Sequence, residues 1–132
     1  MGRTVFMQTS ISAIGSARPA TAWERYADLD RWPRWAPQIT GVEAPARRLT
    51  PGLRGSVRVC GVVGVPFEVL AVDETARTWS WKVRIGPVRL HLEHGVDAEG
   101  LGSRSWLRIR GPAAVVLPYT PVAFVALHCL VL

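Results

Sequence analysis

The sequence predicts an α+β domain in which helices cover one face of an antiparallel sheet. Segments that alternate apolar and polar residues recur about every ten residues in the second half of the chain, which is typical of antiparallel strands joined by tight turns. Two helix-forming segments lie between the first strand and this series. An apolar C-terminal segment predicts one further helix, so strands and helices do not alternate regularly as they would in a parallel sheet.

Length and composition indicate one soluble domain spanning residues 1–132. The chain is 48% hydrophobic and 20% charged, which excludes a disordered chain and permits a substantial core. Its net charge of +6 comes almost entirely from fifteen arginines, since Lys82 is the single lysine. Two cysteines exclude a disulfide scaffold. The N-terminus lacks the long apolar segment of a secretory signal, so we expect a cytoplasmic protein.

The first elements are a strand over residues 4–12 and a helix that ends near Asp28. Ser16 is a candidate N-cap for this helix, and Pro19 fits its first turn. A short helical turn over 30–37 follows, broken by two prolines. The expected later strands span residues 39–43, 56–63, 65–73, 77–85, 88–97 and 103–110.

The C-terminal segment 113–132 contains no charged residue and approaches the length of a membrane span. Pro118 and Pro121 interrupt it, so a helix is expected only over residues 122–132. Eleven helical residues cover about half of a bilayer core. We therefore favour a helix that packs on the sheet, with a membrane span as the alternative.

Alternation along the predicted strands separates an apolar face from a basic face. The basic side chains are expected to be a solvated surface, and contact with anionic lipid headgroups or a polyphosphate is the alternative. No nucleic-acid partner is expected, because Trp106 is the only aromatic residue among the arginines and no binding motif is present. The basic face comprises Arg58, Lys82, Arg84, Arg89, Arg104, Arg108 and Arg110.

Few residues could support catalysis or metal binding. His91 and His94 fall on opposite faces of one strand, and Cys60 falls on the outward face, so no metal site is expected. His94 is either a hydrogen-bonded core histidine or a general acid/base, with Ser105 as a candidate partner. The glycines at 61 and 64 lack the Lys-Ser/Thr of a phosphate loop, so we expect no nucleotide and no other cofactor.

Several segments resemble the polyketide cyclase/dehydrase branch of the START-like (SRPBCC) superfamily. The resemblance covers about residues 4–115, and its order and spacing are more specific than any single motif. The matching segments are Ala17-Arg-Pro-Ala-Thr-Ala-Trp23, Tyr26-Ala-Asp-Leu-Asp-Arg-Trp-Pro-Arg-Trp35, Pro51-Gly-Leu-Arg-Gly, Val69-x-x-x-Asp73-Glu, Arg77-x-x-x-Trp81, His94-x-Val96 and Ile109-x-Gly-Pro112.

The resemblance implies a helix-grip fold: a curved seven-stranded antiparallel sheet with two short N-terminal helices, and a C-terminal helix over an apolar cavity. It implies a small hydrophobic ligand such as a lipid or polyketide, bound or transported. A cyclase or dehydratase using His94 as general acid/base is the alternative. The implied cavity wall comprises Trp35, Val59, Phe67, Val69, Trp79, Trp81, Val83, Leu92, His94, Leu107 and Ile109.

Two departures from the family pattern affect these expectations. The predicted C-terminal helix is short and wholly apolar, so its outer side could meet a second copy of the chain or a membrane. The arginines point outward, whereas the family's aromatase/cyclases are expected to hold arginines and tyrosines inside the cavity. This second departure weakens the case for an enzyme.

Overall fold

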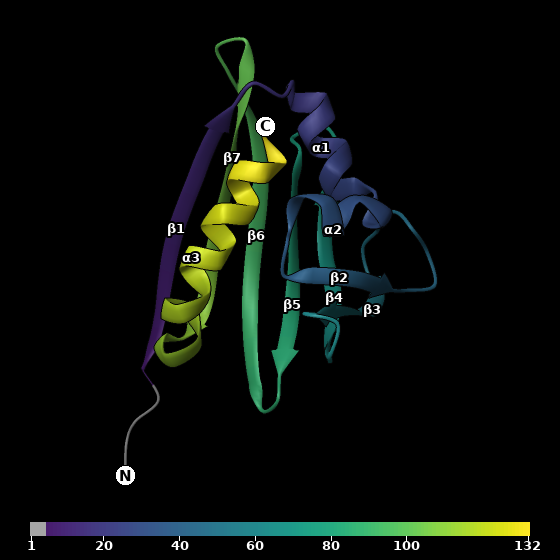
Figure 1. Ribbon diagram of the computed structural model, residues 1–132, viewed down its shortest axis with the longest axis vertical. Helices are drawn as coiled ribbons and strands as arrows, with labels where there is room; N and C mark the ends of the chain where they lie inside the picture. The colour runs from purple at the N-terminus through teal and green to yellow at the C-terminus, as the bar shows by residue number, and fades with distance from the viewer. Residues whose placement is uncertain (1–4) are drawn as a thin grey trace.

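A single curved sheet of seven antiparallel strands forms the frame of the protein (Figure 1). The computed structural model describes residues 5–132, so the predicted start of the first strand at Thr4 lies outside the described residues. The strand order is β1-β7-β6-β5-β4-β3-β2, which leaves β1 and β2 at the two edges. The strands are β1 (Phe6–Gly15), β2 (Ile39–Glu43), β3 (Arg54–Val59), β4 (Val63–Asp73), β5 (Thr78–Ile85), β6 (Val88–Glu99) and β7 (Gly102–Pro112).

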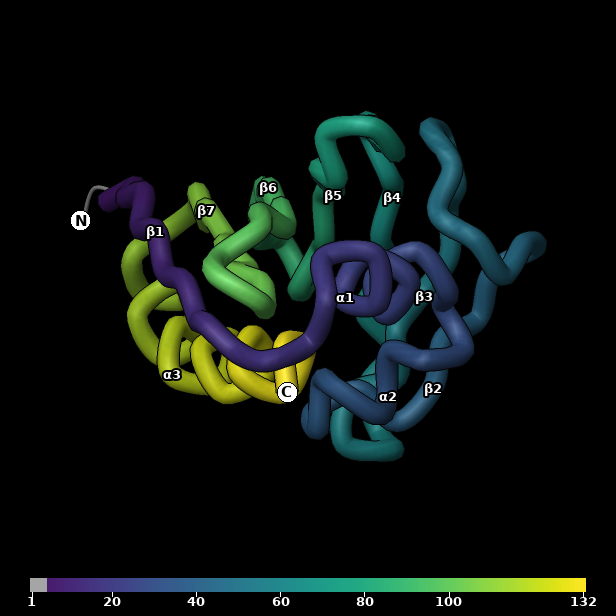
Figure 2. The backbone as a smooth tube through the Cα atoms, turned by 90° about the horizontal axis from the view of Figure 1, so that it is seen from above, coloured from purple at the N-terminus to yellow at the C-terminus, as the bar shows by residue number. Residues whose placement is uncertain are grey.

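The helices all lie on the concave side of this sheet (Figure 2). The C-terminal helix runs beneath β1 and β7, while the short helices from the β1–β2 connection cover the other half of the sheet. This arrangement confirms the predicted α+β class. The helical elements are α1 (Pro19–Ala27), the 3-10 turn η1 (Leu29–Arg31), α2 (Trp32–Trp35) and α3 (Ala113–Leu130).

The predicted separation of the sheet into two faces is confirmed. Trp79, Trp81 and Val83 of β5 are buried on the concave face, whereas Lys82 and Arg84, which follow Trp81 and Val83, are exposed. The same alternation holds along β6 and β7. His91 and His94 accordingly lie on opposite faces. The alternation of apolar and polar residues along the strands therefore places the apolar face of the sheet against the helices.

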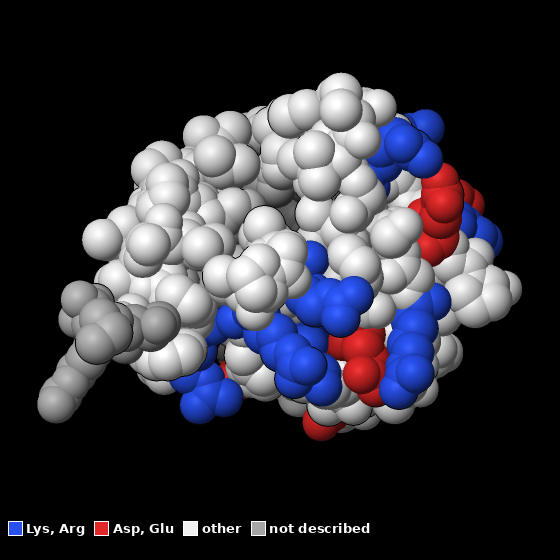
Figure 3. All heavy atoms as spheres, turned by 90° about the horizontal axis from the view of Figure 1, so that it is seen from below, with Lys and Arg blue, Asp and Glu red and all other residues white. Residues whose placement is uncertain are grey.

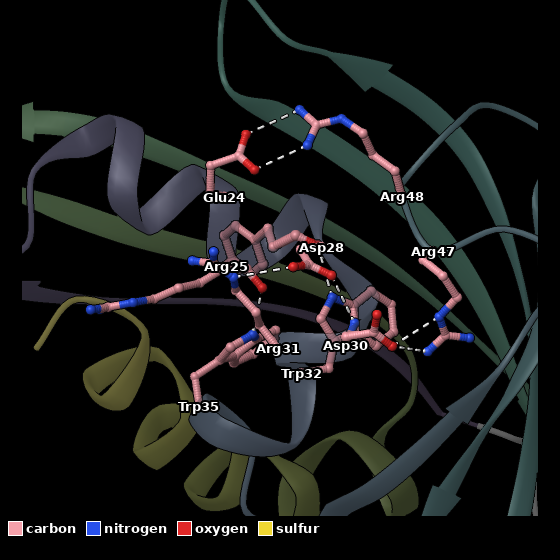
Figure 4. Close-up of polar contacts among 10 residues, drawn as sticks. Glu24, Arg25, Asp28, Asp30, Arg31, Trp32, Trp35, Arg47 and Arg48 are labelled. Carbon is pink, nitrogen blue, oxygen red and sulfur yellow. Dashed lines mark hydrogen bonds and ion pairs between the residues drawn. The ribbon is translucent and has the colours of Figure 1, made fainter.

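Two tryptophans attach α2 to the end of α1. Trp32 Nε1 donates to the carbonyl of Tyr26 at 2.8 Å, and Trp35 Nε1 donates to the carbonyl of Arg25 at 2.8 Å. Both carbonyls belong to the last turn of α1, where C=O groups have no N–H partner within the helix. Salt bridges from Arg48 to Glu24 and from Arg47 to Asp30 surround this junction (Figure 4). The Trp-Pro-Arg-Trp segment thus fixes the helical pair that closes one end of the concave face.

Two local expectations at the N-terminal half are wrong. β1 continues to Gly15, three residues beyond its predicted end. The N-cap of α1 is Arg18, without a side-chain hydrogen bond, so Ser16 does not cap the helix. Pro19 does occupy the first turn as predicted, where its missing N–H leaves no helical bond broken.

The prediction that prolines restrict the C-terminal helix to residues 122–132 is also wrong. The helix α3 spans 18 residues and contains both Pro118 and Pro121. A proline removes the bond to the carbonyl four residues earlier, here those of Ala114 and Leu117. Both residues are exposed, so water can hydrate the released carbonyls. The position of the prolines on the outer side of α3 therefore permits a continuous helix.

By length and composition alone, α3 is apolar enough to cross a membrane, a test that the core helix of a soluble protein also passes. In the structure α3 packs along β1 and β7 as the favoured interpretation expected. Only five of its 18 residues are buried, and its outer face is apolar. The helix therefore covers part of the core while leaving an unusually apolar surface.

Candidate functional site

A cavity of about 390 Å³ lies between the concave face of the sheet and the middle of α3. Four strands, β3 to β6, supply most of its wall. The segment preceding β2 and the helix α3 close it from the other side. The lining residues are Gln38, Ile39, Val57, Val59, Cys60, Val63, Val65, Trp81, Val83, Ile85, Leu90, Leu92, Tyr119 and Val122.

The wall of this cavity is almost entirely apolar. Its polar side chains are Gln38, Cys60 and Tyr119, and none of the described residues that line it is Asp, Glu, Lys, Arg or His. Burial raises the pKa of the Tyr119 hydroxyl above its ordinary value, so this group is neutral as well. An isolated charge placed inside would lose its hydration without gaining a partner. The cavity is thus suited to apolar groups, and its volume falls within the range of small-molecule sites.

A second, much smaller void of about 20 Å³ lies deeper in the core, beside His94. Its wall includes Trp35, Trp79 and Leu107, together with residues of α3. Trp81, Gln38, Ile39 and Tyr119 line both spaces, so these side chains stand between the void and the larger cavity. The void has room for about one water molecule. It is therefore too small to receive an organic ligand.

Both ring nitrogens of His94 are occupied by protein groups. Trp81 Nε1 donates to His94 Nε2 at 3.0 Å, and the other nitrogen, Nδ1, lies 3.2 Å from the Tyr26 hydroxyl. Since Nε2 accepts, the neutral ring carries its proton on Nδ1 and donates to Tyr26. The Trp79 ring stacks on the imidazole at a centroid distance of 4.5 Å. His94 is thereby held as one tautomer in one orientation.

Burial also holds His94 in its neutral form. The side chain is 4% exposed, and this desolvation lowers the pKa of His94 from 6.5 to about 3. The proposed partner Ser105 lies opposite Val96 instead, and its hydroxyl donates to the carbonyl of Leu127 at 3.2 Å. This geometry, a buried neutral imidazole with a partner at each ring nitrogen, is that of a hydrogen-bonded core histidine. The pairing of His94 with Ser105 is therefore wrong.

The eleven residues predicted for the cavity wall fall into three groups. Val59, Trp81, Val83 and Leu92 line the large cavity. Trp35, Trp79, His94 and Leu107 line the small void, which Trp81 also reaches. The remaining three, which line neither space, are packed in the core: Phe67, Val69 and Ile109.

Strand alternation could have identified further lining residues. Val57, Ile85 and Leu90 all alternate onto the inward face of the sheet, so they could have been identified if the position of the cavity opening had been known. Tyr119 was missed because the helix was predicted to start only at Val122. Gln38 lies in a non-repetitive segment, where no periodicity reports which way a side chain points.

The prediction that Cys60 faces outward on a strand is wrong. β3 ends at Val59, and Cys60 occupies the following turn with a φ of 52°. A left-handed residue interrupts the strand alternation, and Cys60 reaches the cavity wall while remaining exposed. Among the described residues, no three His, Cys, Asp or Glu side chains form a cluster that could hold a metal ion.

A curved seven-stranded sheet around a C-terminal helix, with an apolar cavity between them, defines the helix-grip fold of the START-like superfamily. The chain belongs to the family described as "Polyketide cyclase / dehydrase and lipid transport", whose model matches residues 8–123. The predicted resemblance is confirmed by this match.

Among solved structures, the chain is similar to the crystal structure of Ara h 8.0201, with a TM-score of 0.76 and 14% sequence identity. The match covers 96% of this chain and 95% of the other. At this identity the similarity supports the fold alone. The search of curated proteins gave no significant match.

Proposed function

We propose that the protein binds a small hydrophobic molecule in the cavity between the sheet and α3. The observation behind this proposal is the apolar wall of a space of about 390 Å³ that the side chains leave open. A well-packed core of this size contains few voids larger than a water molecule. An unfilled apolar space also costs stability, and an apolar ligand would recover the missing contacts.

The family description is consistent with this proposal, since it includes both lipid transport and polyketide chemistry. The ligand would be a lipid or polyketide whose buried part is uncharged, because no ionic partner is available on the cavity wall. Transport would also require the protein to reach the place where such a ligand resides, which for most apolar molecules is a membrane.

The alternative of a cyclase or dehydratase using His94 receives no support from the geometry. His94 lines the void of about 20 Å³ rather than the large cavity, and both of its nitrogens already have partners. A general base needs hydrogen-bond access to the proton that it removes. In our proposal His94 therefore has a structural role.

Tryptophan fluorescence provides the test, because Trp81 forms part of the cavity wall. The protein would be titrated with palmitic acid, cholesterol and the aromatic polyketide emodin, and we expect a saturable change with at least one of them. The variant Val57→Phe, which fills the cavity, should weaken that binding at least tenfold. The matched control Val125→Phe lies on the outer face of α3 and should bind as the wild type does.

An absence of any saturable response across the three compounds would contradict the proposal. Equal affinities of Val57→Phe and Val125→Phe would also contradict it, because the ligand would then lie outside the cavity. Both variants should first show native circular dichroism, so that a loss of binding is not a loss of folding.

A further inference from the structure

The charged side chains of the sheet are distributed unequally between its two ends. We call the end where β3 and β5 finish and β4 and β6 begin the mouth end, because residues of these strand ends line the cavity. Acidic side chains gather at the opposite end, with Asp73 at the end of β4, Glu74 in the following turn, and Asp97 and Glu99 near the β6–β7 turn. The mouth end is therefore the basic end of the sheet.

Four exposed arginines, Arg58, Arg84, Arg89 and Arg110, lie within two residues of the strand ends at the mouth end. Arg58 forms an ion pair with Glu43. The other three form no ion pair with any described residue, whereas Lys82, Arg104 and Arg108 farther from this end all have acidic partners. Arg84 and Arg89 are directly opposite each other in the β5–β6 ladder. Like charges in such a cross-strand pair repel each other, which a nearby anion would relieve.

Exposed apolar side chains line the cavity or lie within two residues of residues that line it. We define the apolar rim as Val62, Val63, Ile85, Leu117 and Val122. Val62 in the β3–β4 turn is 80% exposed, and Leu117 on α3 is 60% exposed. Val63, Ile85 and Val122 each line the cavity and are also exposed, so the rim is continuous with the interior wall.

The outer face of α3 extends this apolar surface. Phe124 is 42% exposed and Val125 50% exposed, and α3 contains no Asp, Glu, Lys or Arg. Figure 3 shows the molecule from below, with uncharged atoms over the α3 side and basic side chains, with acidic ones among them, along the convex side of the sheet. Contiguous apolar surface of this kind marks an interaction site.

We propose that the mouth end docks on an anionic lipid bilayer, with the apolar rim inserted among the lipids and Arg84, Arg89 and Arg110 against the headgroups. Docking in this orientation would open the cavity toward the bilayer, so that an apolar ligand passes between them without crossing water. The ligand exchange rests on the proposed function, whereas the docking itself depends only on the surface.

A second copy of the chain is the competing occupant of this surface. A twofold interface places the same patch of both copies together. It would bring the unpaired Arg84, Arg89 and Arg110 of both copies into proximity, while the Glu43 carboxylate, which reaches this end, is already paired with Arg58. A bilayer supplies both an apolar interior and anionic headgroups. Charge complementarity therefore favours the bilayer.

Vesicle flotation tests the docking. The full chain would be mixed with vesicles of phosphatidylcholine alone or with 30 mol% phosphatidylglycerol, at 0.1 M and 1 M NaCl. We expect binding only to the anionic vesicles and a marked loss at 1 M salt, where the screening length falls from about 10 Å to about 3 Å. Equal binding to both vesicle types, or none to either, would overturn the proposal.

Matched variants assign the binding to the mouth end. Val62→Glu and Leu101→Glu each place a carboxylate on a fully or largely exposed turn residue, at the mouth end and the opposite end respectively. Val62→Glu should reduce partitioning roughly tenfold or more through lost apolar burial. Leu101→Glu should leave it nearly unchanged. Equal effects of the two substitutions would overturn the proposed orientation.

The contribution of the arginines is tested with two double variants that have the same net charge as each other. Arg84→Gln/Arg89→Gln should reduce partitioning about 25-fold, given about fivefold for each basic residue near an anionic surface. The control Arg18→Gln/Arg34→Gln removes the same charge from exposed positions away from the strand ends. If both double variants lose the same amount, net charge alone attracts the protein, which overturns the assignment to the mouth end.

Two further measurements separate the alternatives. Sedimentation velocity without vesicles should give a monomer, and a dimer that Val62→Glu dissociates would assign the mouth end to a second copy and overturn the docking. The fluorescence titration in vesicle-free buffer reports the cavity independently. A protein that binds a titrant without floating would refute the docking alone, and one that floats without binding would refute the proposed function alone.

Discussion

His94 predicts how the stability of the protein responds to acid. Its pKa is about 3 in the folded protein and 6.5 when the side chain is freely hydrated. Between these values the unfolded chain binds a proton that the folded chain does not, so the free energy of unfolding decreases as pH falls below 6.5. The decrease is about 1.4 kcal/mol for each unit of pH, or about 2 kcal/mol between pH 6.5 and 5. The contribution is fully present above pH 6.5.

Urea denaturation at pH 7.5, 6.0 and 5.0, followed by tryptophan fluorescence, measures this dependence. In the variant His94→Gln, the free energy of unfolding should lose the part of its pH dependence that His94 contributes. At pH 7.5 this variant should be less stable by about 1–3 kcal/mol, because the hydrogen bonds to Trp81 and Tyr26 are disturbed. His91 contributes in the same direction, since burial lowers its pKa too, and His91→Gln removes that part separately. An identical slope in the wild type and His94→Gln would refute the buried neutral assignment.

Three other outcomes follow from the structure. Gly15→Ala should lower stability by about 1–3 kcal/mol in urea melts, because a methyl there would collide with the backbone carbonyl of Val131, while Gly41→Ala, in open space, should have little effect. Burial raises the pKa of Tyr26 above its ordinary value of 10, so stability should fall above pH 10, where only the unfolded chain ionises, and a flat alkaline stability profile would contradict this. His94→Gln should bind the fluorescence-active titrant as the wild type does at pH 7.5; loss of binding in a folded variant would restore His94 to the site.

Much of the fold follows from local sequence patterns. Alternation along β5, with Trp79 and Trp81 on one side and Lys82 and Arg84 on the other, defines which face is buried. The Trp-Pro-Arg-Trp segment predicts a short helical turn, and its two indole N–H groups hydrogen-bond to carbonyls of α1. These features are local, so the sequence alone determines them.

The position of the cavity could not be predicted in the same way. The alternation of side chains along the strands predicts that Phe67, Val69 and Ile109 point inward. Whether an inward residue contacts another side chain or borders empty space depends on the curvature of the whole sheet. The prolines of α3 were misleading for a related reason. Their effect depends on whether the released carbonyls face water, which is known only once α3 is placed on the sheet.

The most direct test of ligand binding in the cavity is native mass spectrometry of the wild type and Val57→Phe after exposure to the same palmitic acid, cholesterol and emodin. We predict that the wild type retains one molecule of at least one compound and that the cavity-filling variant retains none. Equal retention by both proteins, or no retention by the wild type, would contradict the proposed binding site.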